Sequence, residues 1–304
     1  MLISIDHGNK QIKTVHCPPF TSGLVESDTQ PFGAKILKYK GKYYQLTDQR
    51  IPYRKDKTDD ERFFILTLFA IANELTATNC SGANTMHIQL AVGLPPAYYG
   101  TNHQKFISYF LHRGTINYQY AGKTYSVEID DVGCYPQSYA AALTMFQSLQ
   151  TIPKALVLDI GGMTADYLQI KYGEGDLSVC DSLENGVITL YNKITSRVRA
   201  EQDLILSEAE IDAILQEKTV DMPPEVTATV EHLAQEYIAD LLSALRERQL
   251  ELKSGPVIFA GGGSILLRNQ IQVSGKVAHA KFIEEINANA MGYELLYQLS
   301  HAGR

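Results

Sequence analysis

The sequence predicts an α/β protein with two domains, and three observations support this prediction. The 304 residues exceed the length at which one hydrophobic core usually stops growing. Segments that alternate like strands are interspersed with segments of helical periodicity along the whole chain. A strand–turn–strand pattern at the N-terminus starts again at Ala155, so the second half is expected to repeat the organisation of the first.

The first half is expected to begin with a β-hairpin. Residues 1–6 and 10–16 read as two strands around the tight turn Asp6-His7-Gly8-Asn9. A second hairpin is predicted over 34–47, and helical periodicity follows over 58–78, where acidic residues suit the N-terminal turn. The remaining patterns of this half predict a strand over 87–94, a helix over 103–113, strands over 115–131 and an alanine-rich helix over 138–149.

The second half opens with three predicted strands joined by tight turns. They cover residues 155–159, 164–171 and 177–181. A capping box at Ser207 opens one of the helices that follow. The patterns predict helices over 187–201, 207–218 and 225–252, a strand over 256–260 and a terminal helix over 283–299.

Composition limits the classes of function. The formal net charge of −7 disfavours direct binding of nucleic acid, because the surface as a whole does not attract phosphates. No stretch approaches the roughly 20 apolar residues of a membrane helix, and the N-terminus lacks the features of a secretion signal. The cysteines lie far apart and lack the spacing of metal ligands, so we expect a cytoplasmic protein without structural zinc: Cys17, Cys80, Cys134 and Cys180.

One segment, from Lys35 to Lys57, is locally basic and interleaved with tyrosines. A solvated hairpin edge protected by lysines would account for it. A contact surface for a neighbouring subunit or another partner is the alternative interpretation.

Two turns carry the residue types that phosphate binding requires. Asp6 precedes a turn with Gly8 and Asn9, and Asp159 precedes the turn Gly161-Gly162-Met163-Thr164. Glycine allows the backbone N–H groups to approach a phosphate, and an aspartate can hold Mg²⁺ through the ion's water ligands. Two such turns facing each other would grip a triphosphate from both sides.

A third glycine-rich element follows the predicted strand 256–260, with the sequence Gly261-Gly262-Gly263-Ser264. Two further segments, 135–141 and 287–292, stand where connecting motifs would be expected. In order and spacing these five elements resemble the motifs of the actin/Hsp70/sugar-kinase ATPase superfamily. In chain length and in the spacing from Asp6 to Lys13, the sequence is most similar to bacterial and archaeal actin-like proteins of the ParM type, which segregate plasmids or chromosomes.

The resemblance implies an actin-like, ribonuclease H-like fold of two domains with the nucleotide in the interdomain cleft. The first domain would comprise residues 1–154 and 283–304, with a smaller inserted subdomain at about 17–90, and the second would comprise 155–282.

The resemblance also implies roles for individual residues. Asp6 and Asp159 would order the water shell of Mg²⁺, and Gln137 would orient the attacking water. Because a glutamine is a very weak proton acceptor, hydrolysis should be slow. It should depend on closure of the two domains or on a neighbouring subunit, and is expected to be coupled to polymerisation. Asp166 could simply brace the second turn. The phosphates would contact Gly8, Asn9, Lys13, Gly161, Gly162, Met163 and Thr164. The nucleoside would contact Glu184, Asn185, Gly186, Gly261, Gly262, Gly263 and Ser264.

The expected function is therefore a slow ATPase that forms nucleotide-dependent filaments for DNA segregation. ATP is the expected nucleotide, with GTP possible, and Mg²⁺ the expected ion. The partners would be other copies of the chain and a DNA-binding adaptor protein, with no direct contact to nucleic acid or membrane. A small-molecule kinase would need a base near the phosphates, for which the pair Asp130-Asp131 is the best candidate, although a strand-end turn also explains it. A nucleotide-switched scaffold that does not polymerise is the third possibility.

A partial P-loop motif is rejected. Residues 121–124 read Ala-Gly-Lys-Thr, but the motif requires a glycine five residues before Gly122, where Asn117 stands, and a helix afterwards. The alternating residues that follow predict a hairpin instead.

Overall fold

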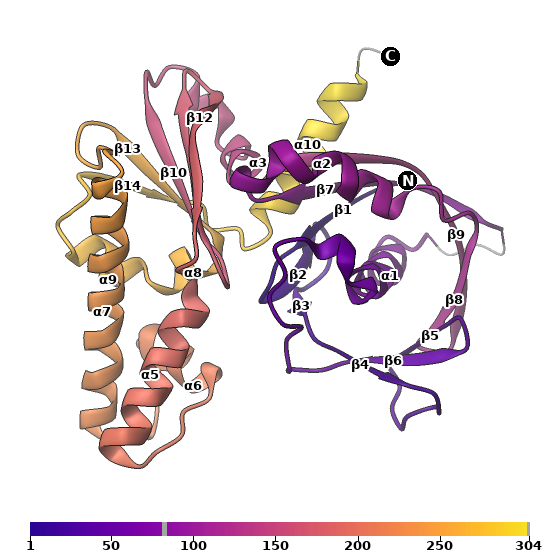
Figure 1. Ribbon diagram of the computed structural model, residues 1–304, viewed down its shortest axis with the longest axis horizontal. Helices are drawn as coiled ribbons and strands as arrows, with labels where there is room; N and C mark the ends of the chain where they lie inside the picture. Colours follow the sequence, from indigo (N-terminus) through magenta and orange to yellow (C-terminus); the bar gives the residue numbers. More distant parts are fainter. Residues whose placement is uncertain (81–83, 303–304) are drawn as a thin grey trace. The chain divides into compact units, whose positions relative to one another are not determined.

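The computed structural model describes residues 1–80 and 84–302. The chain divides into a first unit, 1–144 with 287–304, and a second unit, 145–286 (Figure 1). The sequence placed residues 145–154 and 283–286 with the first domain, whereas their contacts group them with the second unit. Residues 303 and 304, at the end of the expected first domain, and 81–83, within the expected subdomain, lie outside the described residues.

The first unit is built on a nine-stranded sheet with the order β3-β2-β1-β7-β9-β8-β5-β6-β4. Its central strands β1 (Leu2–His7), β7 (Met86–Leu94) and β9 (Lys123–Pro136) are parallel, so their carboxyl ends lie at one edge. The other strands are β2 (Gln11–Thr14), β3 (Phe20–Thr21), β4 (Leu24–Ser27), β5 (Ile36–Tyr39), β6 (Lys42–Leu46) and β8 (Ile116–Tyr120).

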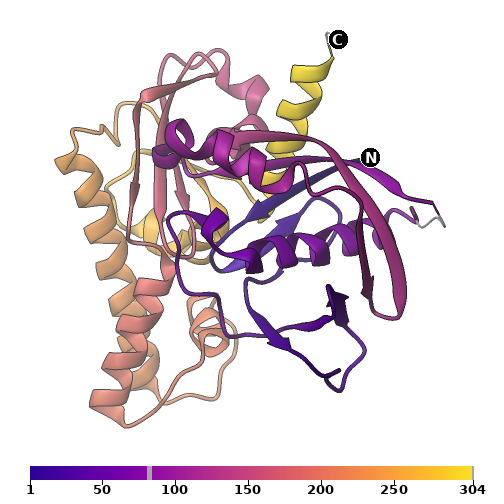
Figure 2. The ribbon, with the colours of Figure 1, turned by 45° about the vertical axis from the view of Figure 1, so that its right-hand side comes forward.

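Helices cover both faces of this sheet. On one face α1 (Glu61–Ala77), preceded by the 3₁₀ turn η1 (Lys57–Asp59), and α2 (Pro96–Phe110) share a core with alternate residues of β1 such as Ile3 and Ile5. The sheet curves around α1 (Figure 2). On the other face Ala91 packs with α3 (Tyr139–Leu143) and α10 (Ala288–His301).

The second unit has a five-stranded sheet with the order β12-β11-β10-β13-β14. Its helices α5 (Val187–Gln202), α6 (Glu208–Leu215) and α7 (Pro224–Glu247) share a core with alternate residues of β10, such as Leu156 and Leu158. The strands are β10 (Ala155–Ile160), β11 (Ala165–Lys171), β12 (Glu174–Leu183), β13 (Pro256–Ala260) and β14 (His279–Phe282). The short helices are α4 (Phe146–Leu149), α8 (Gly261–Leu266) and α9 (Arg268–Val273).

Most predicted elements are confirmed, and the differences have physical causes. Helix α2 begins at Pro96 instead of residue 103, because proline suits the first helical position, where its missing N–H is not needed. The terminal helix begins at Ala288 instead of residue 283, and β14 precedes it at residues 279–282. The capping box at Ser207 is confirmed. Ala121 and Gly122 form the predicted hairpin turn with φ of 50° and 78°, which excludes the P-loop.

Within the described parts of the chain, no helix combines the length and the apolar character needed to cross a membrane.

Candidate functional site

Asp6 lies near the carboxyl end of β1 with 2% of its surface exposed. Oδ1 accepts a hydrogen bond of 2.9 Å from Nε2 of Gln137, which directly follows β9. Oδ2 is 3.5 Å from Nζ of Lys13, the residue paired with Asp6 across the hairpin. Because a carboxylate only accepts, the amide nitrogen of Gln137 must face it, and Oε1 remains as the amide's acceptor. The structure thus brings three predicted site residues together.

The turn after β1 is held by Ser22, a residue that the sequence did not indicate. Its hydroxyl donates to the carbonyl of Gly8, and its backbone N donates to the carbonyl of Lys10 at 3.1 Å. In a trans peptide the carbonyl and the following N–H point in opposite directions. The N–H of Asn9 therefore points away from Ser22, which leaves it directed out of the turn.

His7 is a structural residue. Its ring is fully buried and packs against both Phe106 and Phe110, with ring centroids at 5.7 and 5.4 Å. Nε2 lies 2.8 Å from the hydroxyl of Thr67, which itself donates to a backbone carbonyl, so Nε2 carries the proton. Burial, with a smaller effect of the nearby Lys57 charge, lowers the pKa of His7 to about 3.

The burial of Lys57 changes the interpretation of the basic segment 35–57. Its ammonium donates to the carbonyl of His7, and only 6% of the residue is exposed. Lys38 and Lys40 do lie exposed, with their ammonium groups over the rings of Tyr43 and Tyr39. The solvated edge therefore does not extend to Lys57, which belongs to the support of the first turn.

The second unit places two buried carboxylates opposite each other. Asp159 on β10 pairs directly with Asp166 on β11, and they are 6% and 4% exposed. The hydroxyl of Thr164 donates to Asp166 at 3.1 Å. Like charges in this arrangement repel, and a nearby cation would relieve the repulsion. Two carboxylates side by side can hold Mg²⁺ through the ion's water ligands.

The loop 161–164 presents its backbone. Helix α5 and the residue before it donate hydrogen bonds of 2.9 to 3.0 Å to three of its carbonyl groups: Gly186 to Met163, Val187 to Gly161 and Ile188 to Gly162. By the same peptide geometry, the next N–H groups point away from α5. The side chain of Met163 packs against the core, so the loop offers amides rather than that side chain. The amides that point away belong to Gly162, Met163 and Thr164.

Gly261 and Gly263 pack against the end of β10. A Cβ on Gly261, whose φ is +83°, would lie 2.1 Å from Oδ1 of Asp159, and a Cβ on Gly263 would lie 2.7 Å from the carbonyl oxygen of Ile160. Gly262 has room, since its nearest atoms belong to Ile286 at 3.6 Å or more. Ser264 is fully buried, and its hydroxyl has no hydrogen-bond partner among the described residues.

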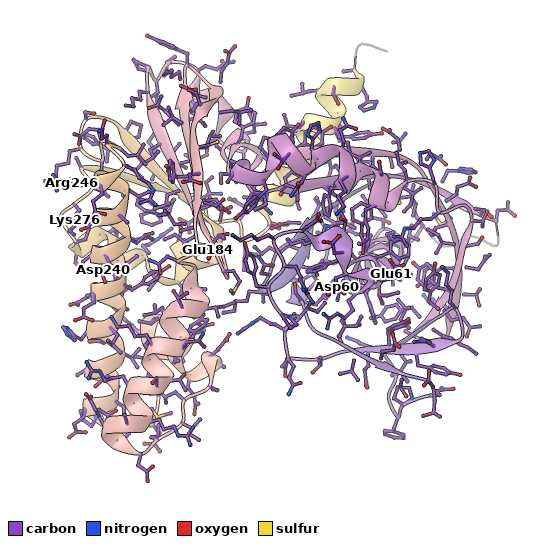
Figure 3. All side chains as sticks on the ribbon, viewed as in Figure 1. Asp60, Glu61, Glu184, Asp240, Arg246 and Lys276 are labelled. Atoms are coloured by element: carbon purple, nitrogen blue, oxygen red, sulfur yellow. The ribbon has the colours of Figure 1, made fainter. Side chains whose placement is uncertain are left out.

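The predicted nucleoside segment precedes α5. The side-chain oxygen of Asn185 accepts from the hydroxyl of Thr189 at 3.0 Å, and its backbone carbonyl accepts from the hydroxyl of Tyr237 at 2.6 Å. A Cβ on Gly186 would lie 2.4 Å from the carbonyl oxygen of Gly162. Glu184, labelled in Figure 3, is the exposed member of the segment. Gly186 thus supports the loop, Asn185 is bonded to α5 and α7, and Glu184 alone presents an exposed side chain.

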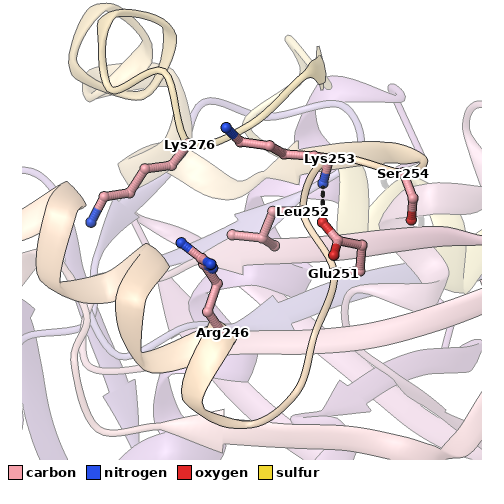
Figure 4. A pocket seen from close by; sticks show the side chains of 6 residues that line it. All are labelled: Arg246, Glu251, Leu252, Lys253, Ser254 and Lys276. Atoms are coloured by element: carbon pink, nitrogen blue, oxygen red, sulfur yellow. Dashed lines mark hydrogen bonds between the residues drawn. The ribbon is translucent and has the colours of Figure 1, made fainter.

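A pocket of about 440 Å³ lies at the C-terminal end of α7, apart from all these motifs. Three cationic side chains surround it, and the backbone N of Lys253 donates to Glu251 at 2.8 Å (Figure 4). None of the predicted site residues lines it. The lining residues are Arg246, Glu251, Leu252, Lys253, Ser254 and Lys276.

Asp130 and Asp131 lie within β9, so the expectation of a strand-end turn is wrong. Asp131 accepts from the hydroxyl of Tyr297 at 2.6 Å, and Asp130 pairs with His87 at 2.9 Å. The register aligns Asp131 with Leu2, which is four residues or about 13 Å along β1 from Asp6. The pair therefore lies far from the first turn.

Two family models match the sequence. The model described as the N-terminal domain of actin-like proteins matches residues 4–139. The model described as the C-terminal part of an archaeal, MreB-like actin homologue matches residues 157–273. None of the curated proteins matches.

Solved structures resemble this chain over nearly its whole length. The ADP complex of Ta0583, an archaeal actin homologue, is 18% identical with a TM-score of 0.74, over 98% of this chain and 99% of that one. A 15-stranded ParM filament from Clostridium botulinum is 16% identical with a TM-score of 0.76, over 98% and 99% of the two chains. The Alp12 filament is 16% identical with a TM-score of 0.66, over 99% and 98%. At this identity the likeness is one of fold.

Proposed function

We propose that this chain, which belongs to the actin-like proteins, is a slow ATPase that binds ATP with Mg²⁺ and assembles into filaments with other copies of itself. The hydrogen bond of 2.9 Å between Nε2 of Gln137 and Oδ1 of Asp6 carries this proposal. It joins the residue proposed to orient water to the carboxylate at the base of the first turn. Gln137 is buried, so its orientation is fixed by this bond.

In this proposal each unit would supply one turn for the phosphates. The backbone N–H of Asn9 and those of residues 162–164 point out of their turns, and Lys13 adds a positive charge beside Asp6. Bound Mg²⁺ would neutralise phosphate charge, and Asp6 and the pair Asp159 and Asp166 are the carboxylates that would hold its water ligands.

Oε1 of Gln137 would accept a hydrogen bond from the attacking water and thereby orient it. An amide cannot take up the proton that this water loses. Positioning without a strong base supports slow hydrolysis that accelerates when the site is completed by assembly. For the nucleoside we propose Gly262 and Glu184, the members of the two predicted segments with space or an exposed side chain.

Self-assembly is supported by the two filament structures with the same fold. We further propose that the filaments segregate DNA in the cytoplasm through an adaptor protein, because the net charge of −7 disfavours direct contact with DNA. ATP is the nucleotide proposed, with GTP as the alternative.

Light scattering and phosphate release, followed together, test this function. The purified protein is mixed with MgATP, with MgGTP, with a non-hydrolysable ATP analogue or with no nucleotide. We expect scattering to rise with MgATP and to decay as phosphate appears. Asp159→Asn should abolish phosphate release, whereas Asp130→Asn, which removes a carboxylate far from the first turn, should retain it.

If scattering stays flat over a wide range of protein concentration while nucleotide still binds, filament formation is contradicted. The protein would then be interpreted as a nucleotide-switched scaffold. Transfer of phosphate to an added metabolite would instead identify a kinase. The kinase interpretation relied on Asp130 and Asp131 as the base near the phosphates. Asp131 lies far from the first turn and does not suit that role.

A further inference from the structure

We infer that Asn289 is a positioning residue for Gln137, acting through the backbone of Ser138; the inference rests on the proposed role of Gln137 in hydrolysis. Asn289 lies in the first turn of α10, 151 residues from Ser138 in sequence. Its side chain accepts from the backbone N of Ser138, the residue that follows Gln137, so an effect on Gln137 would pass through this backbone.

Ser138 forms the centre of a tight γ-turn. The backbone N of Tyr139 donates to the carbonyl of Gln137 at 2.6 Å, and Ser138 has φ of 63° and ψ of −53°. This conformation is strained for any residue with a Cβ, and it persists only where surrounding contacts impose it. The turn directs Gln137 toward Asp6 on one side and starts α3 on the other.

Asn289 provides such a contact. Its side-chain oxygen accepts a hydrogen bond of 3.0 Å from the backbone N of Ser138, and the two residues are 7% and 0% exposed. With water excluded, loss of this acceptor would leave the N–H of Ser138 without a partner, which is costly in a buried site. Without this hydrogen bond the strained backbone of Ser138 would relax to a more favourable conformation, and Gln137 would turn with it.

Asn289 is itself held in place from two directions. Asn287, at the start of α10, donates from its side chain to the carbonyls of Thr14 and Val15, both at 3.1 Å, which attaches the helix to the end of β2. Gly292 lies so close to α3 that a Cβ there would be 1.9 Å from the carbonyl oxygen of Ala140. The first turns of α10 thus fix the accepting oxygen relative to both the hairpin and α3.

The chemistry of Ser138 gives the inference a specific consequence. Glycine adopts positive φ without steric cost, so a glycine at position 138 would form the turn without help from Asn289. If Asn289 acts by imposing this conformation, Ser138→Gly should make it dispensable. If Asn289 acts by packing alone, glycine at position 138 should bring no rescue.

Steady-state ATP hydrolysis by the full chain tests this relationship. We expect Asn289→Ala to lower kcat at least tenfold and to leave KM for ATP within twofold of the parent. Adding Ser138→Gly should return kcat to within threefold of the parent. Ser138→Ala in the Asn289→Ala background, which removes only the hydroxyl and keeps the Cβ, should not rescue. An unchanged kcat in Asn289→Ala, or equal rescue by alanine and glycine, would overturn the inference.

A second measurement needs no hydrolysis. The side-chain amide of Gln137 is assigned in ¹⁵N-labelled protein by its absence from the spectrum of Gln137→Glu. We expect this resonance to move toward that of a free glutamine in Asn289→Ala and to return in the double variant with Ser138→Gly. A resonance that stays in place would overturn the inference even if the parent protein hydrolyses no ATP, in which case the proposed function fails separately. If Asn289→Ala does not fold, the double variant Asn289→Ala/Ser138→Gly provides the test. The inference requires this variant to fold and to show the Gln137 resonance at its position in the parent.

Discussion

Gly261 and the carboxylate of Asp159 leave no room for a side chain between them. A Cβ on Gly261 would lie 2.1 Å from Oδ1 of Asp159, and the backbone of Gly261 has φ of +83°. Asp159 can therefore occupy its buried position only because residue 261 has no side chain.

Gly261→Ala should displace Asp159. We expect phosphate release to fall by roughly 100-fold, because electrostatic groups at a reacting phosphate act only from fixed positions. Gly275→Ala is the matched control, since Gly275 also has positive φ (+63°) but open space around its Cβ. It should lose roughly 1 kcal/mol of stability from backbone strain and retain hydrolysis. Equal hydrolysis by Gly261→Ala and the parent would contradict the role of Asp159.

Removing the hydroxyl of Ser22 should loosen the first turn, because it donates to the carbonyl of Gly8. We expect Ser22→Ala to weaken ATP binding by roughly tenfold, or about 1.4 kcal/mol, measured by calorimetry. Ser27→Ala removes a half-buried hydroxyl at the end of β4 that bonds to nearby Thr29, and it should bind ATP like the parent. Equal affinities of the two variants for ATP would show that Ser22 does not contribute to nucleotide binding.

Replacing Lys57 should destabilise the first unit. Lys57→Met leaves the carbonyl of His7 without its charged donor, and we expect a loss of roughly 1–3 kcal/mol in the free energy of unfolding. Lys40→Met, at an exposed position on the hairpin turn, should change it by less than about 0.5 kcal/mol. Urea denaturation of both variants checks this, and similar midpoints would show that Lys57 is not structural.

His7 should make stability depend on pH. Its pKa is about 3 in the folded protein and 6.5 ordinarily, so between these values the unfolded chain binds a proton that the folded chain does not. Stability contributed by neutral His7 is therefore complete above pH 6.5 and is lost as the pH falls toward 3. From pH 7 to 5 the parent should lose about 2 kcal/mol more than His7→Phe. Urea unfolding at both pH values measures the difference, and His232→Gln, on the surface of α7, should behave like the parent.

The sequence predicted the fold because its strongest signals are local. Asp6 and Asp159 stand at strand ends before glycine turns, and their order predicted the actin-like α/β architecture that the solved structures confirm. The roles of individual site residues stay predictions, but the geometry refines them. Ser22 was missed and Lys57 was assigned to a solvated edge, because hydrogen bonds to backbone carbonyls leave no periodic pattern.

Long-range pairings were equally beyond the sequence. Neither periodicity nor a motif indicates that Asn289 accepts from the backbone of Ser138, or that Asp131 belongs with Tyr297. The distance from Asp131 to Asp6 follows only from strand register, which joins residues 2, 89 and 131 across three strands. Short elements such as β14 and α9 were missed because four to six residues are too few to show a period.

The insertion of the second unit between residues 144 and 287 sets the order in which the protein is completed on the ribosome. The first unit is begun first but finished last, because α10 must still cover the sheet face that holds Ala91. Elongation at roughly 5–20 residues per second separates the synthesis of β7 from that of α10 by about 10 to 40 seconds. During that interval the second unit is synthesised while the sheet face around Ala91 still lacks α10, and this apolar face is a surface to which a chaperone would bind.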